Sequence, residues 1–176
     1  MPWNKIAILG IVLTALIAGA ALYYLQVYAY YDKVQATPLE VQLTSVSTGQ
    51  PEPIIFDRFE GIDADSSPLR YRACFDTVLS QALLTETYVI VDNAEPRVAP
   101  GWFDCFDAAR IGADLQGGDA IAFLGVENIH YGIDRIVAVY PDGRGYAWHQ
   151  INACGEVVFD GNPVPENCPT PPESLR

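Results

Sequence analysis

No lysine follows Lys33 in this chain of 176 residues, so arginine supplies all the strongly basic side chains beyond that point. The segment after Lys33 holds 21 acidic residues against 8 arginines, a net charge of -13 at pH 7. Such a domain repels nucleic acid and anionic lipid surfaces, because both are densely negative. We therefore expect basic proteins or cations as charged partners and no nucleic acid. The alternative is that the acidity only keeps the domain soluble.

Charged residues are also absent from residues 6–31. Residues 6–24 alone would form a helix of roughly 29 Å, close to the thickness of the hydrocarbon layer. One interpretation is a secretory signal cleaved near the small residues at 18–20, and the other is a retained anchor. The long apolar run and its tyrosine-rich end, typical of a membrane interface, favour a transmembrane signal-anchor helix over residues 1–33, with Trp3 at the opposite interface.

The orientation of this anchor depends on few charges. One lysine lies just outside each end of the apolar run, and the N-terminal amine favours the N-terminus inside. We therefore predict an inner (plasma) membrane protein, N-in, whose domain at 34–176 lies in the periplasm.

Four cysteines all follow the apolar run: Cys74, Cys105, Cys154 and Cys168. No C-x-x-C motif occurs, and with only two histidines no zinc spacing is present, so we predict no metal site. An even cysteine count in an exported domain indicates two disulfides, for which three pairings are possible. A bond between Cys154 and Cys168 would hold the C-terminal tail and leave Cys74 to pair with Cys105. The alternative is four buried thiols in a cytosolic domain.

Alternating and continuous apolar runs predict the strands of the domain. These runs lie at 39–46, 54–59, 69–75, 87–91, 120–126 and 156–159. The clearest element is a pair of strands within 133–152, joined by a Pro-Asp-Gly turn.

Two segments have helical signals. One is a short helix at 76–85 with Asp76 as N-cap, and the other lies within 99–118 and ends at the glycine pair 117–118. A proline-rich tail at 162–176 would be extended and held by Cys168. The fold class is therefore α+β, with an N-terminal transmembrane helix and a small periplasmic domain of mostly antiparallel sheet, about two helices and two disulfides.

Catalytic motifs are missing from the sequence. There is no serine in a nucleophile elbow and no glycine-rich phosphate loop. His130 or His149 could act as a base beside Asp134 or Asp107, but a hydrogen-bonded structural histidine is the simpler interpretation. We predict that the protein is not an enzyme and needs no cofactor.

The segment "GWFDCFD" at 101–107 places three aromatic residues around Cys105. At helical spacing Trp102 and Phe106 would be neighbours and would pack over a disulfide in the core. In the alternative interpretation, Trp102, His130 and His149 line a ligand site.

The end of the apolar run carries five tyrosines: Tyr23, Tyr24, Tyr28, Tyr30 and Tyr31. At 100° per residue they fit with Val27 within an arc of roughly 160°. Their zone is about 12 Å long, whereas the headgroup layer is roughly 5–8 Å deep. Small residues follow a second stripe at Ala7, Gly10, Thr14, Ala18 and Ala21, which would let another helix approach closely. We predict a membrane or partner interface at Gly10, Thr14, Ala18, Tyr23, Tyr24, Tyr28 and Tyr31.

Five segments carry a resemblance to a known family: "GAALYYLQVYAYYDK", "LRYRACF", "APGWFDCFDA", "GVENIHYGIDRIVAV" and "GRGYAWHQINACGEVVFDG". In them the chain resembles small uncharacterised alphaproteobacterial proteins with one membrane span and an exported four-cysteine domain. Some members carry a histidine-kinase label, but this sequence has no phosphoacceptor or nucleotide motif. The resemblance implies an inner-membrane location and no particular activity.

These features lead to one functional hypothesis and one alternative. The hypothesis is a non-catalytic, single-span accessory subunit or assembly factor of a respiratory or photosynthetic electron-transfer complex in the inner membrane. Its partners would be integral membrane subunits of that complex and a basic periplasmic protein such as a c-type cytochrome. The alternative is a free-standing periplasmic ligand-binding or sensing module.

Overall fold

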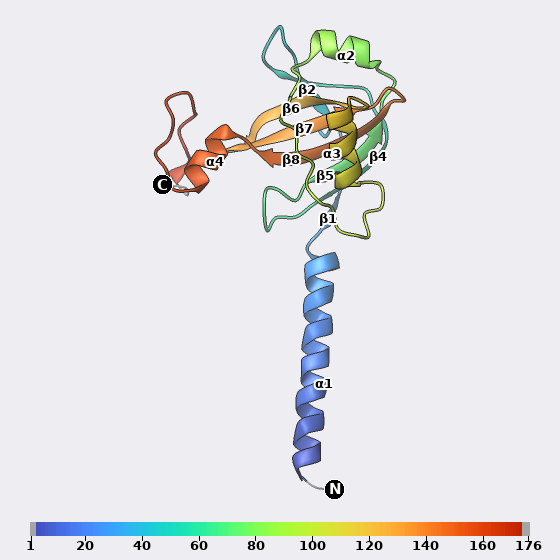
Figure 1. Cartoon of the computed structure of the whole chain (residues 1–176), viewed down its shortest axis with the longest axis vertical. Coiled ribbons are helices and arrows are strands. Elements are labelled where there is room, and N and C mark those ends of the chain that lie inside the picture. The colour runs from blue at the N-terminus through green and yellow to red at the C-terminus, as the bar shows by residue number, and fades with distance from the viewer. Residues whose placement is uncertain (1–2, 174–176) are drawn as a thin grey trace. The chain divides into compact units, whose positions relative to one another are not determined.

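The structure is a computed structural model that describes residues 3–173. It divides into two compact units, Met1–Asp32 and Lys33–Arg176, and each is described by itself. The first unit is helix α1 (Trp3–Tyr24), continued by the π-helical turn η1 (Leu25–Ala29), and neither contains a buried residue (Figure 1). The combined helix is long and apolar enough to cross a membrane, a property that a signal sequence shares. It is therefore a candidate membrane anchor or signal sequence.

The second unit is built on a six-stranded sheet in the order β1-β4-β5-β8-β7-β6, and every neighbouring pair from β4 to β6 is antiparallel. Its strands are β1 (Asp32–Val34), β4 (Asp57–Asp63), β5 (Arg72–Asp76), β6 (Ile121–His130), β7 (Ile133–Val139) and β8 (Arg144–Ile151). A small antiparallel pair, β2 (Gln42–Thr44) and β3 (Pro51–Pro53), lies beside β6. Together with the helices this confirms the predicted α+β class.

The β7–β8 hairpin is the element that the sequence predicted best. Val139 pairs with Gly145 and Ile133 with Ile151, so the two strands match over their whole length. The turn needs Gly143, whose φ of 89° is in the left-handed region that side chains disfavour. This hairpin lies inside the sheet between β5 and β6, and most residues of its two strands are buried.

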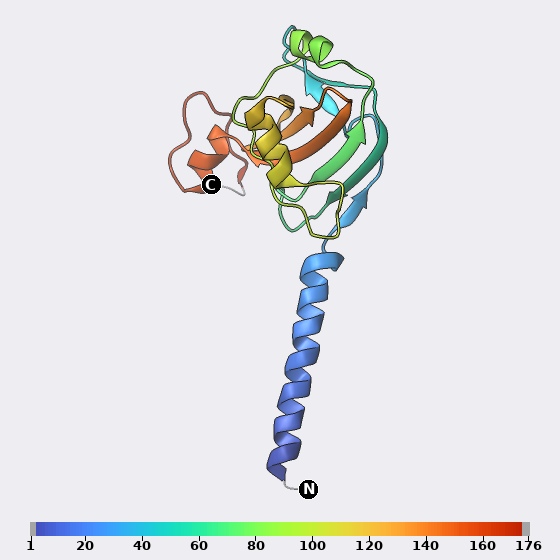
Figure 2. The same ribbon diagram turned by 45° about the vertical axis from the view of Figure 1, so that its right-hand side comes forward.

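Both faces of the sheet are covered. On one face Val137, Val139 and Ala147 join a core cluster with Val41 and Leu43 of the β2 region. On the other face, Trp148 is fully buried and α3 (Ala108–Gly117) lies across the strands (Figure 2). Because the central strands are buried on both faces, polar side chains on them lie away from water and are expected to be hydrogen-bonded inside the fold.

Between residues 33 and 173 this unit contains three α-helices, where the sequence predicted about two. They are α2 (Gln81–Thr87), α3 and α4 (Ala153–Phe159). The predicted strand at 156–159 is wrong because Asn152 caps a helix there, its side chain accepting a 3.0 Å hydrogen bond from the Gly155 amide. The predicted N-cap Asp76 is also wrong, since residue 76 ends β5 and Ser80 caps α2.

Several other helices and strands begin or end at residues that differ from the predicted ones. The helix expected within 99–118 begins only at Ala108, because Asp107 caps it by accepting two 3.1 Å hydrogen bonds from the amides of Ala109 and Arg110. Its predicted end is confirmed by Gly118, which has a φ of 80°. The expected strand at 54–59 starts at Asp57 and runs on to Asp63. Within the expected strand at 87–91, Thr87 belongs to α2, and Tyr88 and Ile90 form isolated bridges.

Both disulfides favoured by the sequence are present. Cys74 of β5 is bonded to Cys105, and Cys154 of α4 is bonded to Cys168 in the tail. The first bond joins a strand to the loop before α3, not to the helix itself. Because such bonds persist in oxidising compartments, they indicate an exported domain.

Candidate functional site

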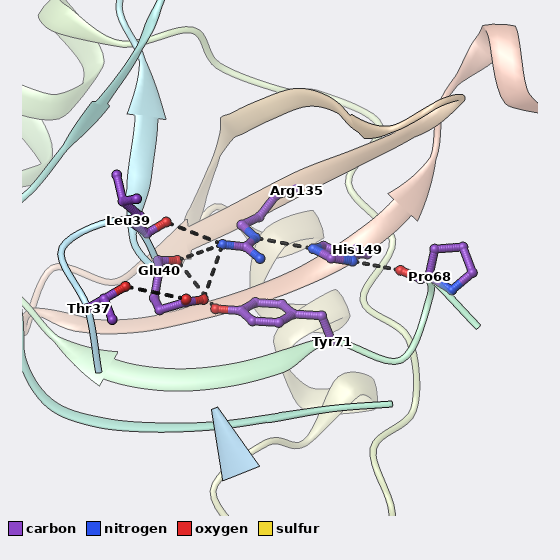
Figure 3. A network of polar contacts seen from close by, with 7 residues as sticks. All are labelled: Thr37, Leu39, Glu40, Pro68, Tyr71, Arg135 and His149. Carbon is purple, nitrogen blue, oxygen red and sulfur yellow. Dashed lines mark hydrogen bonds and ion pairs between the residues drawn. The ribbon is translucent and has the colours of Figure 1, made fainter. Parts of the chain in front are cut away.

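A buried polar network surrounds Arg135, a residue of strand β7 (Figure 3). Arg135 is only 7% exposed, and its register partner His149 on β8 is 1% exposed. The Arg135 Nε donates a 3.2 Å hydrogen bond to His149 Nε2. Antiparallel pairing therefore places the two side chains next to each other on one face of the sheet.

His149 uses its second ring nitrogen as well. Its Nδ1 lies 2.6 Å from the backbone oxygen of Pro68, which can only accept, so Nδ1 carries the proton and the ring is neutral. Burial and the neighbouring Arg135 guanidinium lower the pKa of His149 to about 3. With both nitrogens engaged inside the fold, His149 is a structural hydrogen-bonding residue.

The charge of Arg135 is balanced by the segment before β2. Its Nη1 donates to the backbone oxygen of Glu40 at 3.2 Å and forms an ion pair with Glu40 Oε2 at 3.4 Å. The guanidinium carbon lies 3.9 Å from the centroid of the Tyr71 ring, a close cation–π contact. The Tyr71 hydroxyl in turn donates a 3.3 Å hydrogen bond to the backbone oxygen of Glu40. Burial raises the pKa of Tyr71. The network thus fastens residues 37–40 to the sheet.

The predicted acid–base pairs are not formed. Asp134 Oδ1 instead accepts hydrogen bonds of 2.8 Å from the Asn128 amide and 2.7 Å from Asn152 Nδ2. Asp107 caps α3. Both carboxylates stabilise local backbone, because short polar side chains satisfy amides that the strand or helix leaves open.

The alternative ligand site of Trp102, His130 and His149 is not assembled as one site. The rings of His130 and His149 are close, with centroids 5.9 Å apart, but His149 is buried. Trp102 instead lines a separate cavity of about 570 Å³ with Phe59 and Phe103. His130 lines another cavity, of about 550 Å³, which shares no lining residue with the first.

The aromatic segment at 101–107 also differs from its prediction. Trp102 and Phe106 are not helical neighbours, because the helix begins only at residue 108. Phe106 is buried and packs edge-on against Trp148, at 6.3 Å between centroids, whereas Trp102 packs against Phe103. The Cys105 disulfide holds this loop against β5.

No group of three or more His, Cys, Asp or Glu side chains within residues 3–173 is placed to hold a metal ion. Two acidic residues, Asp63 and Asp65, line a cavity together with His130.

The tyrosines at the end of the apolar helix meet through a feature that the sequence did not reveal. Over η1 the helix widens to i→i+5 hydrogen bonding, so the constant 100° step does not hold. Tyr28 lies 6.4 Å from Tyr23 and 5.8 Å from Tyr24 between ring centroids. The three rings therefore form a cluster, although Tyr23 and Tyr28 are five residues apart.

The small residues of the stripe lie on the exposed surface of α1. Thr14 donates a 2.8 Å hydrogen bond from its hydroxyl to the Gly10 oxygen, so this polar group is satisfied within the helix. A Cβ added at Gly10 would meet nothing within 4 Å. Gly10, Thr14 and Ala18 thus form an exposed stripe of small side chains on the described helix.

A protein-family model described as a family of unknown function (DUF6446) matches residues 41–169, more than two thirds of the chain. The chain belongs to this family. Neither the curated proteins nor the solved structures include a match to the chain.

The DUF6446 match includes all four cysteines and both histidines, together with Arg135 and Tyr71. It begins one residue after Glu40 and leaves out α1 and its tyrosines. The sequence predicted two disulfides and left their pairing open, and it carried no signal for the Arg135–His149–Tyr71 network, because the members of that network are far apart in the chain.

Proposed function

We propose that this DUF6446 protein is a non-catalytic, membrane-anchored accessory subunit or assembly factor of a respiratory or photosynthetic electron-transfer complex in the inner membrane. The observation that carries the proposal is the cluster of Tyr23, Tyr24 and Tyr28 at the end of the apolar helix. Their exposed fractions are 62%, 60% and 43%. Tyrosine combines an apolar ring with a hydroxyl, which suits a boundary between lipid, water and another protein.

A π-helical turn supports the same interpretation. Such turns are rare and recur at functional sites. Here the turn gathers three tyrosines on one side of the helix. Tyrosines that only contact lipid headgroups would not need to lie on one side. An integral membrane subunit packed against this side would give the cluster its partner, and the stripe at Gly10, Thr14 and Ala18 would let that helix approach.

The non-catalytic part of the proposal is supported by how the fold uses its titratable groups. His149 is neutral and fully engaged, and Asp134 and Asp107 stabilise backbone. These groups would have to break structural hydrogen bonds before they could transfer a proton in a reaction.

The charge of the domain suggests a second partner. An acidic surface raises the association rate of a basic protein, such as a c-type cytochrome, in a salt-sensitive way. The periplasmic placement needed for this encounter is part of the proposal.

A pull-down from native membranes in a mild detergent tests the proposal. We expect a stoichiometric integral membrane partner that remains bound at high salt. We also expect a basic soluble partner that is recovered at low salt and lost when the Debye length falls to about 3 Å in 1 M salt. Recovery of the protein alone under both conditions would count decisively against an accessory subunit.

A further inference from the structure

The His130 cavity lies where distant parts of the exported domain meet. It is lined by the end of β4, the loop after it, the turn between β6 and β7, the end of α4, and the tail. The residues that matter are Asp63, Asp65, His130, Tyr131, Phe159 and Pro172. Its volume of about 550 Å³ falls within the usual range for small-molecule sites.

Asp63 gives this cavity its charge. Its Oδ1 accepts a 2.8 Å hydrogen bond from the Ala64 amide, and burial raises its pKa. The negative charge of Asp65 also raises the pKa of Asp63, whereas the charges of Arg135 and His130 lower it. No salt bridge to Asp63 occurs among residues 3–173, because Arg135 directs its guanidinium at Glu40 and His149.

The other walls of the cavity are apolar or aromatic. Tyr131 and Phe159 contribute rings, and Pro68 and Pro172 contribute apolar surface. Carboxylates beside aromatic rings favour cations whose substituents are apolar, since such cations gain both an ion pair and contact with ring faces. A metal ion would gain little from the rings and lacks a third ligand among the described side chains.

We propose that the His130 cavity binds a small organic ammonium ion, either a protonated primary amine or a quaternary ammonium ion, with short apolar substituents. The ammonium group pairs with the carboxylate of Asp63, with Asp65 adding negative potential. The apolar substituents contact Tyr131, Phe159 and Pro172. This site does not depend on the host complex proposed above.

The Cys154–Cys168 disulfide keeps the cavity walls together. It joins α4, which supplies Phe159, to the tail that supplies Pro172. The tail is further held by the Asn162 amide, which donates to the Val157 oxygen at 3.1 Å. The walls are thus ordered before a ligand arrives, which lowers the entropic cost of binding.

Calorimetric titration of the full-length protein in maltoside micelles, with its disulfides intact, tests the site. The probes are choline, ethanolamine and 3,3-dimethylbutan-1-ol, the uncharged isostere of choline. We expect saturable one-to-one binding of at least one of the two ammonium probes below roughly 10 mM, and no binding of the alcohol. Absence of saturable binding for both ammonium probes, or equal affinity for the alcohol and choline, would overturn the proposal.

Matched variants locate the binding. Asp63→Asn keeps the hydrogen-bonding shape but removes the charge, and we expect affinity to fall roughly tenfold or more. Phe159→Leu keeps apolar contact but removes the ring, and a several-fold loss is expected. Asp92→Asn removes one charge from an exposed position outside the cavity and should leave affinity unchanged. If Asp63→Asn fails to fold, Asp65→Asn takes its place; wild-type affinity in the folded variant would overturn the assignment.

Discussion

Arg135 Nε donates a 3.2 Å hydrogen bond to His149 Nε2, and this contact joins two neighbouring central strands through their buried side chains (Figure 3). A protonated imidazole could not accept that bond and would place a second positive charge beside the guanidinium. Tyr71 covers the pair, stacking on His149 with centroids 4.8 Å apart. The network is therefore compatible with only one protonation state of His149.

The stability of the domain should consequently fall between neutral and mildly acidic pH. The pKa of His149 is about 3 in the folded protein, against about 6.5 in an unfolded chain. Within this window the unfolded chain binds a proton that the folded protein does not, so the free energy of unfolding decreases as pH falls. From pH 7 to pH 5.5 we expect a loss of about 1 kcal/mol from His149, measured by urea unfolding under non-reducing conditions.

Substitution of His149 tests whether this residue carries the pH dependence of stability. His149→Gln should remove this pH dependence while lowering stability at pH 7, because the neutral contacts are lost. A variant that changes packing but no titratable group, Gly155→Ala, should keep the wild-type slope. An unchanged slope in His149→Gln would show that the histidine is not the group that titrates.

The β7–β8 hairpin could be predicted from sequence because its signals are local: two runs rich in strand-forming residues and a Pro-Asp-Gly turn between them. Two disulfides could be predicted from the even cysteine count of an exported domain, but the choice among three pairings needed the folded structure. The α4 helix could not be predicted, since its apolar residues 157–159 suit a strand equally well and the deciding interaction is the Asn152 cap.

The buried network lay beyond sequence reasoning for a different reason. Glu40 and Arg135 are 95 positions apart, and only the finished sheet brings them into contact. The sequence singled out the tyrosines, but the meeting of three of their rings depends on a π-helical turn that no residue pattern indicated, and their role as an interface stays a prediction.

Two helical glycines should respond to alanine in opposite directions. In α4, a Cβ on Gly155 would collide with the Gly132 backbone oxygen and come within 2.9 Å of Ile151 Cγ2. Gly155→Ala should therefore cost roughly 1–3 kcal/mol of unfolding free energy. In α3, a Cβ on Gly112 has Pro96 Cδ at 3.8 Å, an ordinary contact, so Gly112→Ala should add about 0.5–1 kcal/mol. Thermal or urea unfolding measures both, and destabilisation of equal size would contradict the close α4 packing.

Loss of each disulfide should have a different effect on the stability of the domain and on ligand binding. Their sequence separations are 31 for Cys74–Cys105 and 14 for Cys154–Cys168. In the chain-entropy treatment, loss of the longer loop costs about 4 kcal/mol and loss of the shorter about 3 kcal/mol. Paired alanine variants and urea unfolding measure this order. Ammonium binding should suffer more from loss of Cys154–Cys168, which holds the cavity wall, and the reverse order would place the ligand elsewhere.

The tyrosine cluster makes a directional prediction for the assembled complex. Tyr24, Tyr28 and Tyr31 should be more buried there than Gln26 and Ala29, because a partner would cover the side on which the rings gather. A photo-reactive phenylalanine analogue placed singly at these five positions in native membranes tests this. Cross-links to an integral membrane partner should form from the three tyrosine positions and be weak from 26 and 29. Equal labelling around the helix would mean that the tyrosines meet only lipid headgroups, and the accessory-subunit proposal would lose its main structural support.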